Sequence, residues 1–151
     1  MKKGFKKPSA ATQRAILAGY RSGLEQRIQE QLDDAGCKAQ YEPFKIPYEV
    51  PLSNHNYTPD FVLENGIVIE TKGRWVLVDR KKIALLKEQY PNLDLRMVFS
   101  NSNSRIRKGA KSRYKDVCEK LDIPYADKEI PVEWLFEKPN RKSLNLLKKM
   151  N

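Results

Sequence analysis

Two acidic residues and a lysine in the middle of the chain have the types and spacing that phosphodiester hydrolysis requires. Asp60 follows Pro59, and Glu70 and Lys72 follow after an apolar stretch. Carboxylate oxygens are the ligands that Mg²⁺ and Mn²⁺ prefer, and a lysine beside them can orient water or stabilise the negative charge that develops on a phosphate. Glu70 and Lys72 project from one face of a strand because side chains alternate along it.

The turn between two predicted strands, residues 57–63 and 67–72, decides whether Asp60 joins Glu70. A two-residue turn would make Asp60 face away from Glu70. A three-residue turn that ends with Gly66 in a left-handed bulge places the two carboxylates opposite each other. We favour this register because it also separates an apolar face from the charged one, and a slip by one residue would destroy both. The apolar face then contains Phe61, Leu63, Ile67, Ile69 and Thr71, and the other face contains Asp60, Val62, Val68, Glu70 and Lys72.

A structural role is the alternative for these charged residues. Asp60 could be a turn residue after a proline, and Glu70 and Lys72 could lie on a solvated strand face. A solvated face would not need Val62 and Val68 beside the charges, so we prefer the catalytic interpretation.

Glu25 is more ambiguous than the other acids. Ser22 and Glu25 fit a capping box, in which the glutamate carboxylate returns to the backbone amide of the serine at the start of a helix. Taken by themselves, these residues favour the capping role over a metal ligand contributed by the first helix.

Hydrophobic periodicity predicts an α/β fold with a small mixed β-sheet flanked by helices. The first strong helix begins at Ser22 and ends before Gly36, and a helical stretch near 12–18 precedes it. Residues 38–50 are predicted to be extended, but Pro43, Pro47 and Pro51 place them at an edge or outside the main sheet. The later elements are a helix capped by Asp79 that runs to Tyr90, a strand over 93–100, a polar basic loop over 101–109, a helix capped by Ser112, an extended piece near Tyr125 and a helical turn at Trp134.

The charge distribution predicts a nucleic-acid partner. The chain carries 29 lysines and arginines against 19 acids, for a net charge of +10. Residues 1–24 and 95–115 contain only basic charges. General solubility is the alternative explanation, but such clustering favours binding to phosphates.

Other features of the composition narrow the possible sites and compartments. One histidine and two cysteines without ligand spacing argue against a zinc site, so a metal here would rely on carboxylates. No apolar run approaches the roughly 20 residues of a membrane span, and the basic start lacks the apolar core of a signal peptide. We therefore expect a soluble, intracellular protein with no membrane partner.

Several separate blocks of the sequence, in order, closely resemble the phage endonuclease I family, the Holliday-junction resolvases of T-odd coliphages. This family belongs to the PD-(D/E)XK nucleases, which share a restriction-endonuclease-like core. The resemblance extends from about Arg21 to Trp134. The blocks are Arg21-Ser22-Gly23-Leu24-Glu25, Pro47 to Pro51, Ser53-Asn54-His55-Asn56-Tyr57-Thr58-Pro59-Asp60-Phe61, Asn65-Gly66-Ile67, Glu70-Thr71-Lys72-Gly73, Asp79-Arg80-Lys81-Lys82, Cys118-Glu119-Lys120 and Pro131-Val132-Glu133-Trp134.

The resemblance implies a role for each candidate residue. Asp60 and Glu70, with the carbonyl of Thr71, would bind one Mg²⁺, and Asp60 and Glu25 would bind a second in the same active site, with Mn²⁺ able to substitute. Lys72 would be the catalytic lysine. The resemblance thus makes Glu25 a metal ligand, although it can also cap its helix. We expect DNA contacts from Arg21, Ser22, His55, Lys72, Arg105, Arg107 and Lys108, and an exposed or locally hydrogen-bonded His55 is the alternative for that residue.

The resemblance also implies an intertwined homodimer in which the N-terminal helix and first strand exchange across a β-bridge, here residues 45–52. The dimer would cut two opposed strands of branched DNA in the cytoplasm of a phage-infected bacterium. We expect a basic arm over 1–20, a nuclease domain over 21–137 and a basic tail over 138–151.

Two other functions remain open from the residues alone. One is a less selective restriction-type or repair-type nuclease with the same site, and only the resemblance favours branched DNA over it. The other is a non-catalytic architectural DNA-binding protein. Acids in a basic groove would repel phosphates unless a metal lay between them, which argues against the architectural protein.

Overall fold

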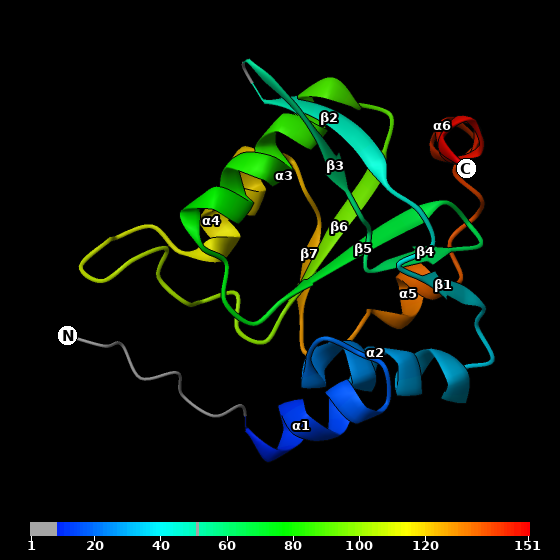
Figure 1. Cartoon of the computed structure of the whole chain (residues 1–151), viewed down its shortest axis with the longest axis horizontal. Coiled ribbons are helices and arrows are strands. Elements are labelled where there is room, and N and C mark those ends of the chain that lie inside the picture. Colours follow the sequence, from blue (N-terminus) through cyan, green and yellow to red (C-terminus); the bar gives the residue numbers. More distant parts are fainter. Residues whose placement is uncertain (1–8, 51) are drawn as a thin grey trace.

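A five-stranded mixed sheet forms the centre of the protein in the computed structural model, which describes residues 9–50 and 52–151. The strand order is β1-β4-β5-β6-β7, with antiparallel pairing from β1 to β5 and parallel pairing from β5 to β7 (Figure 1). The strands are β1 (Ala39–Tyr41), β4 (Phe61–Leu63), β5 (Ile67–Lys72), β6 (Asp94–Phe99) and β7 (Tyr125–Asp127). The predicted α/β class, with a small mixed sheet flanked by helices, is confirmed.

Helices cover both faces of this sheet (Figure 1). Leu24, Ile28 and Leu32 recur at helical spacing, so α2 buries one stripe against Phe61, Ile67 and Ile69. On the other face, side chains of α3 and α4 pack with Val62 and Val68. The helices are α1 (Ala10–Leu17), α2 (Gly23–Asp34), α3 (Leu77–Gln89), α4 (Tyr114–Lys120), α5 (Val132–Leu135) and α6 (Arg141–Met150). In the described part of the chain, no helix has the length and hydropathy to cross a membrane.

The hairpin of β4 and β5 adopts the predicted bulged register. Phe61 pairs with Ile69 and Val62 pairs with Val68. Gly66 has a φ of 91°, and its amide donates to the carbonyl of Leu63 at 3.0 Å. A residue with a side chain is strained in this left-handed conformation, so the glycine sets the register that aligns the acidic residues.

We expect Gly66→Ala to destabilise the fold by about 2–4 kcal/mol, combining backbone strain with overpacking. A Cβ at this position would lie 2.9 Å from Cγ of Leu144 and 3.1 Å from the carbonyl oxygen of Asn140. Gly36→Ala is the matched control, because Gly36 also has a positive φ, of 66°, but a Cβ there meets nothing within 4 Å. Urea denaturation measures the free energy of unfolding of both variants. Equal losses of this free energy would mean that the contact with α6 contributes nothing.

A second, two-stranded sheet lies outside the main one and consists of β2 (Ile46–Val50) and β3 (Ser53–Tyr57) (Figure 1). The extended segment expected over 38–50 thus divides in two, because β1 is an edge strand of the main sheet and β2 lies outside it, while Pro51 lies outside the described residues. Reciprocal hydrogen bonds between Gln89 and Glu49 fasten β2 to the end of α3. Leu52, in the turn of this hairpin, has a φ of 77°, which is a strained conformation for a leucine.

Some predicted boundaries are wrong for identifiable reasons. The strand expected over 57–63 is interrupted after Tyr57, since Pro59 lacks an amide and the side chain of Asp60 takes over bonding to β5. The helix assigned to an Asp79 cap begins at Leu77, so Asp79 lies within its first turn. The cap expected at Ser112 falls on Arg113, whose amide donates to Asp116.

Helices occupy both terminal segments for which the sequence analysis expected basic extensions. α1 lies within residues 1–20, consistent with the helical stretch expected near 12–18, and residues 1–8 lie outside the described part of the chain. Within the expected tail, Asn140 caps α6, and Ser143 donates its hydroxyl to the carbonyl of Gly66 at 2.6 Å. This helix therefore packs on the β4–β5 turn instead of extending freely.

Candidate active site

Asp60 is held just before β4 begins by two hydrogen bonds from β5. The amide and the hydroxyl of Thr71 both donate to Oδ2 of Asp60, each at 2.8 Å. Asp60 is 6% exposed, and no donor contacts its Oδ1 within the described residues. Asp60 therefore presents one fixed oxygen and one available oxygen at the sheet.

Glu70 and Lys72 leave the same face of β5, as the alternation of the strand predicts. Oε1 of Glu70 lies 3.2 Å from Nζ of Lys72, and its Oε2 accepts a hydrogen bond from the Tyr57 hydroxyl at 2.6 Å. Asp79, from the first turn of α3, also faces Lys72 at 3.7 Å. Burial lowers the pKa of Lys72, but the charges of Glu70 and Asp79 outweigh burial and raise it above its ordinary value. The lysine therefore stays protonated.

Glu25 lies on α2, the helix that packs against Phe61, Ile67 and Ile69 of the sheet. It is 6% exposed. Half of the predicted capping box is present, because the Glu25 amide donates to Oγ of Ser22 at 3.2 Å. The other half is wrong: the Glu25 carboxylate accepts from the amide of Arg21 at 2.9 Å, and also from the Tyr41 hydroxyl at 2.6 Å. The structure thus places Glu25 where it can serve both its helix and a site beside Asp60.

The carboxylates form one electrostatic unit. Burial, followed by the charge of Glu70, raises the pKa of Asp60 from 3.8 to about 7, and the charge of Glu25 adds to the shift. The hydrogen bonds from Thr71 act in the opposite direction but do not offset burial. Burial and the neighbouring acids therefore favour the protonated form of Asp60, and a bound cation would reverse this preference.

We expect Asp60→Asn to stabilise the protein in EDTA, increasingly as the pH rises. A raised pKa means that the fold prefers protonated Asp60, so its contribution to stability is complete below about pH 4 and is lost as the pH rises through about 7. The cost at pH 8 is at most about 4 kcal/mol, and asparagine removes it. At pH 8 we expect the midpoint of thermal unfolding to rise by roughly 5 °C, with little change at pH 4.

Asp127→Asn is the matched control for this experiment. Asp127 also accepts hydrogen bonds from an amide and a hydroxyl, those of Ser102, with one at each of its oxygens, but it is exposed and lies outside the site. If the midpoint of thermal unfolding changes with pH in the same way in Asp60→Asn and in Asp127→Asn, the electrostatic coupling of Asp60 to the glutamates is contradicted.

A divalent cation fits the chemistry of these residues. The available donors are carboxylate oxygens and the backbone carbonyl of Thr71, the hard ligands that Mg²⁺ and Mn²⁺ prefer. No three acidic, histidine or cysteine side chains form a ready-made metal cage among residues 9–50 and 52–151. Mg²⁺ commonly uses one or two carboxylates and completes its shell with water and substrate phosphate, so the acids match an open site that substrate completes.

The predicted DNA contacts fall into separate groups. Arg21 is exposed and pairs with Glu42 at 3.1 Å, next to the Ser22 cap. His55 lies on β3 and is exposed, with its ring bonded to Oγ of Ser53 at 2.9 Å, so the local hydrogen bond expected as the alternative is present.

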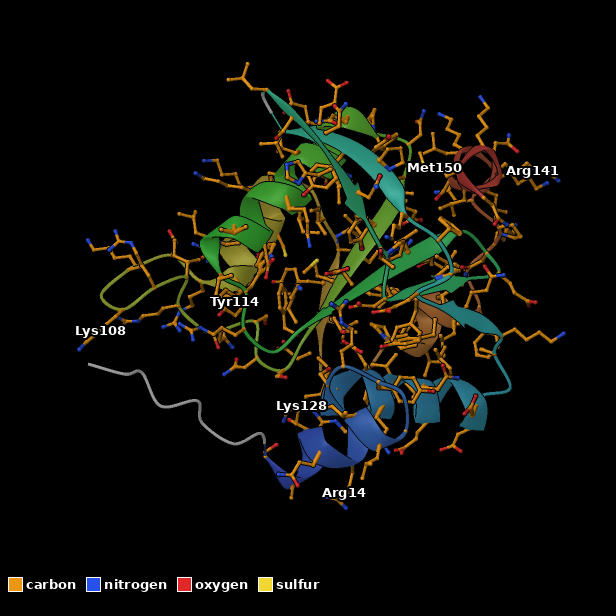
Figure 2. The ribbon with its side chains drawn as sticks, viewed as in Figure 1. Arg14, Lys108, Tyr114, Lys128, Arg141 and Met150 are labelled. Atoms are coloured by element: carbon orange, nitrogen blue, oxygen red, sulfur yellow. The ribbon has the colours of Figure 1, made fainter. Side chains whose placement is uncertain are left out.

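The loop between β6 and α4 carries the remaining group, the exposed Arg105, Arg107 and Lys108. Figure 2 shows Lys108 at the outer end of this loop, away from the sheet. The amide of Ser100, where the loop begins, donates to the carbonyl of Lys72 at 3.1 Å. The basic loop therefore starts directly beside the lysine of the site.

Three side chains at the site were missed by the sequence analysis. Tyr41 and Tyr57 each bond a glutamate, and Asp79 pairs with Lys72 instead of capping its helix. No spacing rule connects these tyrosines to their partners, since tertiary packing alone joins β1 to α2 and β3 to β5. The position of Asp79 seven residues beyond Lys72 was visible, but its capping role was the simpler interpretation.

Comparison with known proteins finds similar sequences. The sequence profile of the phage endonuclease I family matches residues 7–151. The endonuclease I of Escherichia phage T7 is 48% identical over 133 residues, which cover 88% of this chain and 89% of that protein. The endodeoxyribonuclease 1 of Enterobacteria phage T3 is 54% identical over 118 residues, which cover 78% of each.

Proposed function

Because the chain belongs to the phage endonuclease I family, we propose that it is a metal-dependent DNA endonuclease that resolves four-way junctions. The alignment of Asp60, Glu70 and Lys72 at the ends of β4 and β5 carries this proposal. DNA as the substrate agrees with the name of the T3 relative, an endodeoxyribonuclease, and with the net charge of +10.

The residues divide the hydrolytic work between them. Asp60, Glu70 and the Thr71 carbonyl would hold one Mg²⁺, and Asp60 with Glu25 would hold a second. When bound, the metal supplies Lewis acidity for the attacking water and for the phosphate. Lys72 pairs with Glu70 and Asp79 through its ammonium group, so its part would be to stabilise negative charge on the phosphate.

The basic loop supplies a surface for the DNA backbone next to this centre. Arg105, Arg107 and Lys108 are exposed on it, and its first residues adjoin Lys72. Phosphate contacts position a protein on DNA without reading sequence. The exposed basic groups lie on loops and on helix surfaces without a compact recognition-helix motif, which supports recognition of DNA shape.

The β2–β3 hairpin supports a strand-swapped homodimer. The hairpin lies outside the main sheet, and its turn contains the strained Leu52. Opening this turn relieves that strain and lets β2 of one protomer pair with β3 of its partner. The elements α1, α2 and β1 then exchange between protomers, with the same contacts that the single chain makes with itself.

Junction selectivity is tested by gel-shift titrations in EDTA at one fixed salt concentration. We expect four-way junctions of unrelated sequence to bind with similar affinity, at least about tenfold more tightly than their linear arms, since recognition is by shape. A strong preference for one linear sequence would favour a restriction-type nuclease instead.

A further inference from the structure

Two tyrosine hydroxyls donate to the two glutamates of the site at the same distance. Tyr57 donates to Oε2 of Glu70 at 2.6 Å, and Tyr41 donates to Oε2 of Glu25 at 2.6 Å. These distances are typical of strong O–H···O⁻ hydrogen bonds to an ionised carboxylate. Each bond joins separate elements, β3 to β5 and β1 to α2.

All three carboxylates of the site therefore have one oxygen fixed by a protein donor. The amide and hydroxyl of Thr71 fix one oxygen of Asp60, as the phenols fix one oxygen of each glutamate. Within the described residues, the second oxygen of Asp60 or Glu25 meets no hydrogen-bond donor, and that of Glu70 faces Lys72 at 3.2 Å. A carboxylate anchored in this way keeps one oxygen in a defined direction for a cation.

We propose that Tyr57 and Tyr41 are positioning residues that orient Glu70 and Glu25 for divalent-cation binding. The inference rests on the proposed metal-dependent function and extends it to a second layer of residues. Both rings are held firmly. Tyr57 is 1% exposed in the core. The centroid of the Tyr41 ring lies 5.2 Å from that of Phe61 and 4.9 Å from that of Tyr20.

Each tyrosine lies on the same side of the β2–β3 turn as its glutamate. Glu25 and Tyr41 precede the turn, whereas Tyr57 and Glu70 follow it. An exchange of elements across this turn therefore moves each pair as a unit. The positioning is the same whether the site forms within one chain or between two chains, so the test does not depend on dimer topology.

The test compares Tyr57→Phe and Tyr41→Phe with Tyr125→Phe. Tyr125, half-buried on β7, also donates to a glutamate at 3.0 Å, but its partner Glu119 is not one of the acids of the site. Free Mn²⁺ is counted by electron paramagnetic resonance in titrations of the DNA-free protein, after circular dichroism has verified each fold. We expect Mn²⁺ affinity to fall about 10-fold to 100-fold in the two site variants and to stay unchanged in the control.

Cleavage gives a second readout. If the phenols act through the metal, raising the Mg²⁺ concentration restores most of the activity of each site variant, whereas a general structural defect does not respond to metal. Wild-type affinity for Mn²⁺ in both site variants, with wild-type Mg²⁺ dependence, would overturn the positioning role.

The two proposals fail in different ways. If the wild-type protein binds no more Mn²⁺ than Asp60→Asn does, the positioning role is refuted, and cutting of DNA in EDTA would refute the metal-dependent function as well. If the wild type binds Mn²⁺ but the tyrosine variants bind it equally well, only the positioning role is refuted. Should Tyr57→Phe not fold, Tyr41→Phe decides the question, because Tyr41 is only half-buried.

Discussion

Lys72→Ala is expected to lower the rate of DNA cleavage by about 10³-fold while junction affinity changes little. Asp60→Asn and Glu70→Gln should cause losses at least as large, because each removes a charged ligand from the metal site. Binding should survive in all three variants, since affinity comes mainly from the basic surface and removing an acid does not weaken it.

The measurement pairs a single-turnover cleavage time course with a gel-shift titration for each variant. Lys82→Ala is the matched control for charge. Lys82 lies near the site and approaches Asp79 at 3.9 Å, but no ion pair joins it to the three carboxylates in the described structure. Near-normal cleavage by two of the three site variants would refute the site assignment.

A mixed dimer is expected to recover nicking activity that both of its parent homodimers lack. One protomer carries Glu25→Ala and the other carries Asp60→Ala. If α2 crosses to the partner, one site combines the two wild-type residues and is intact, while the other site holds both lesions. The heterodimer should then nick one strand of a junction at up to about half the wild-type rate, against losses of about 10³-fold in the parents.

The unswapped alternative predicts a different outcome. In the single chain, Glu25 already lies near enough to raise the pKa of Asp60, so an unswapped dimer would contain one lesion in every site. The protomers should be co-expressed with different tags and purified through both, because intertwined chains exchange slowly. No nicking by a verified heterodimer that still binds junctions would exclude the exchanged arrangement.

The core of the site could be predicted because its geometry is local. Gly66 selects the turn, the turn sets the register of β4 and β5, and the alternation of β5 puts Glu70 and Lys72 on one face. Each step depends on residues close together in the sequence. The apolar stripe of α2 was equally readable, since Leu24, Ile28 and Leu32 share one side of the helix.

The rest of the site depends on contacts between distant segments. The phenol of Tyr57 reaches Glu70 only because the separate β2–β3 hairpin ends beside β5, and nothing in the local sequence pattern encodes that contact. The C-terminal segment was expected to be a basic tail because of its lysines, yet the docking of α6 depends on Ser143 meeting the Gly66 carbonyl. Asp79 illustrates the same limit. Its position in the sequence fits a helix cap, and only tertiary packing brings it to its ion pair with Lys72.

The most direct test of the proposed function is cleavage of one four-way junction beside its linear duplex arms, with and without Mg²⁺. The account predicts symmetric cutting of two opposed strands of the junction in Mg²⁺, at least about 10²-fold slower cutting of the arms, and no cutting of either substrate in EDTA. Equal cutting of junction and arms would contradict selectivity for branched DNA, and cutting in EDTA would contradict the metal-dependent mechanism.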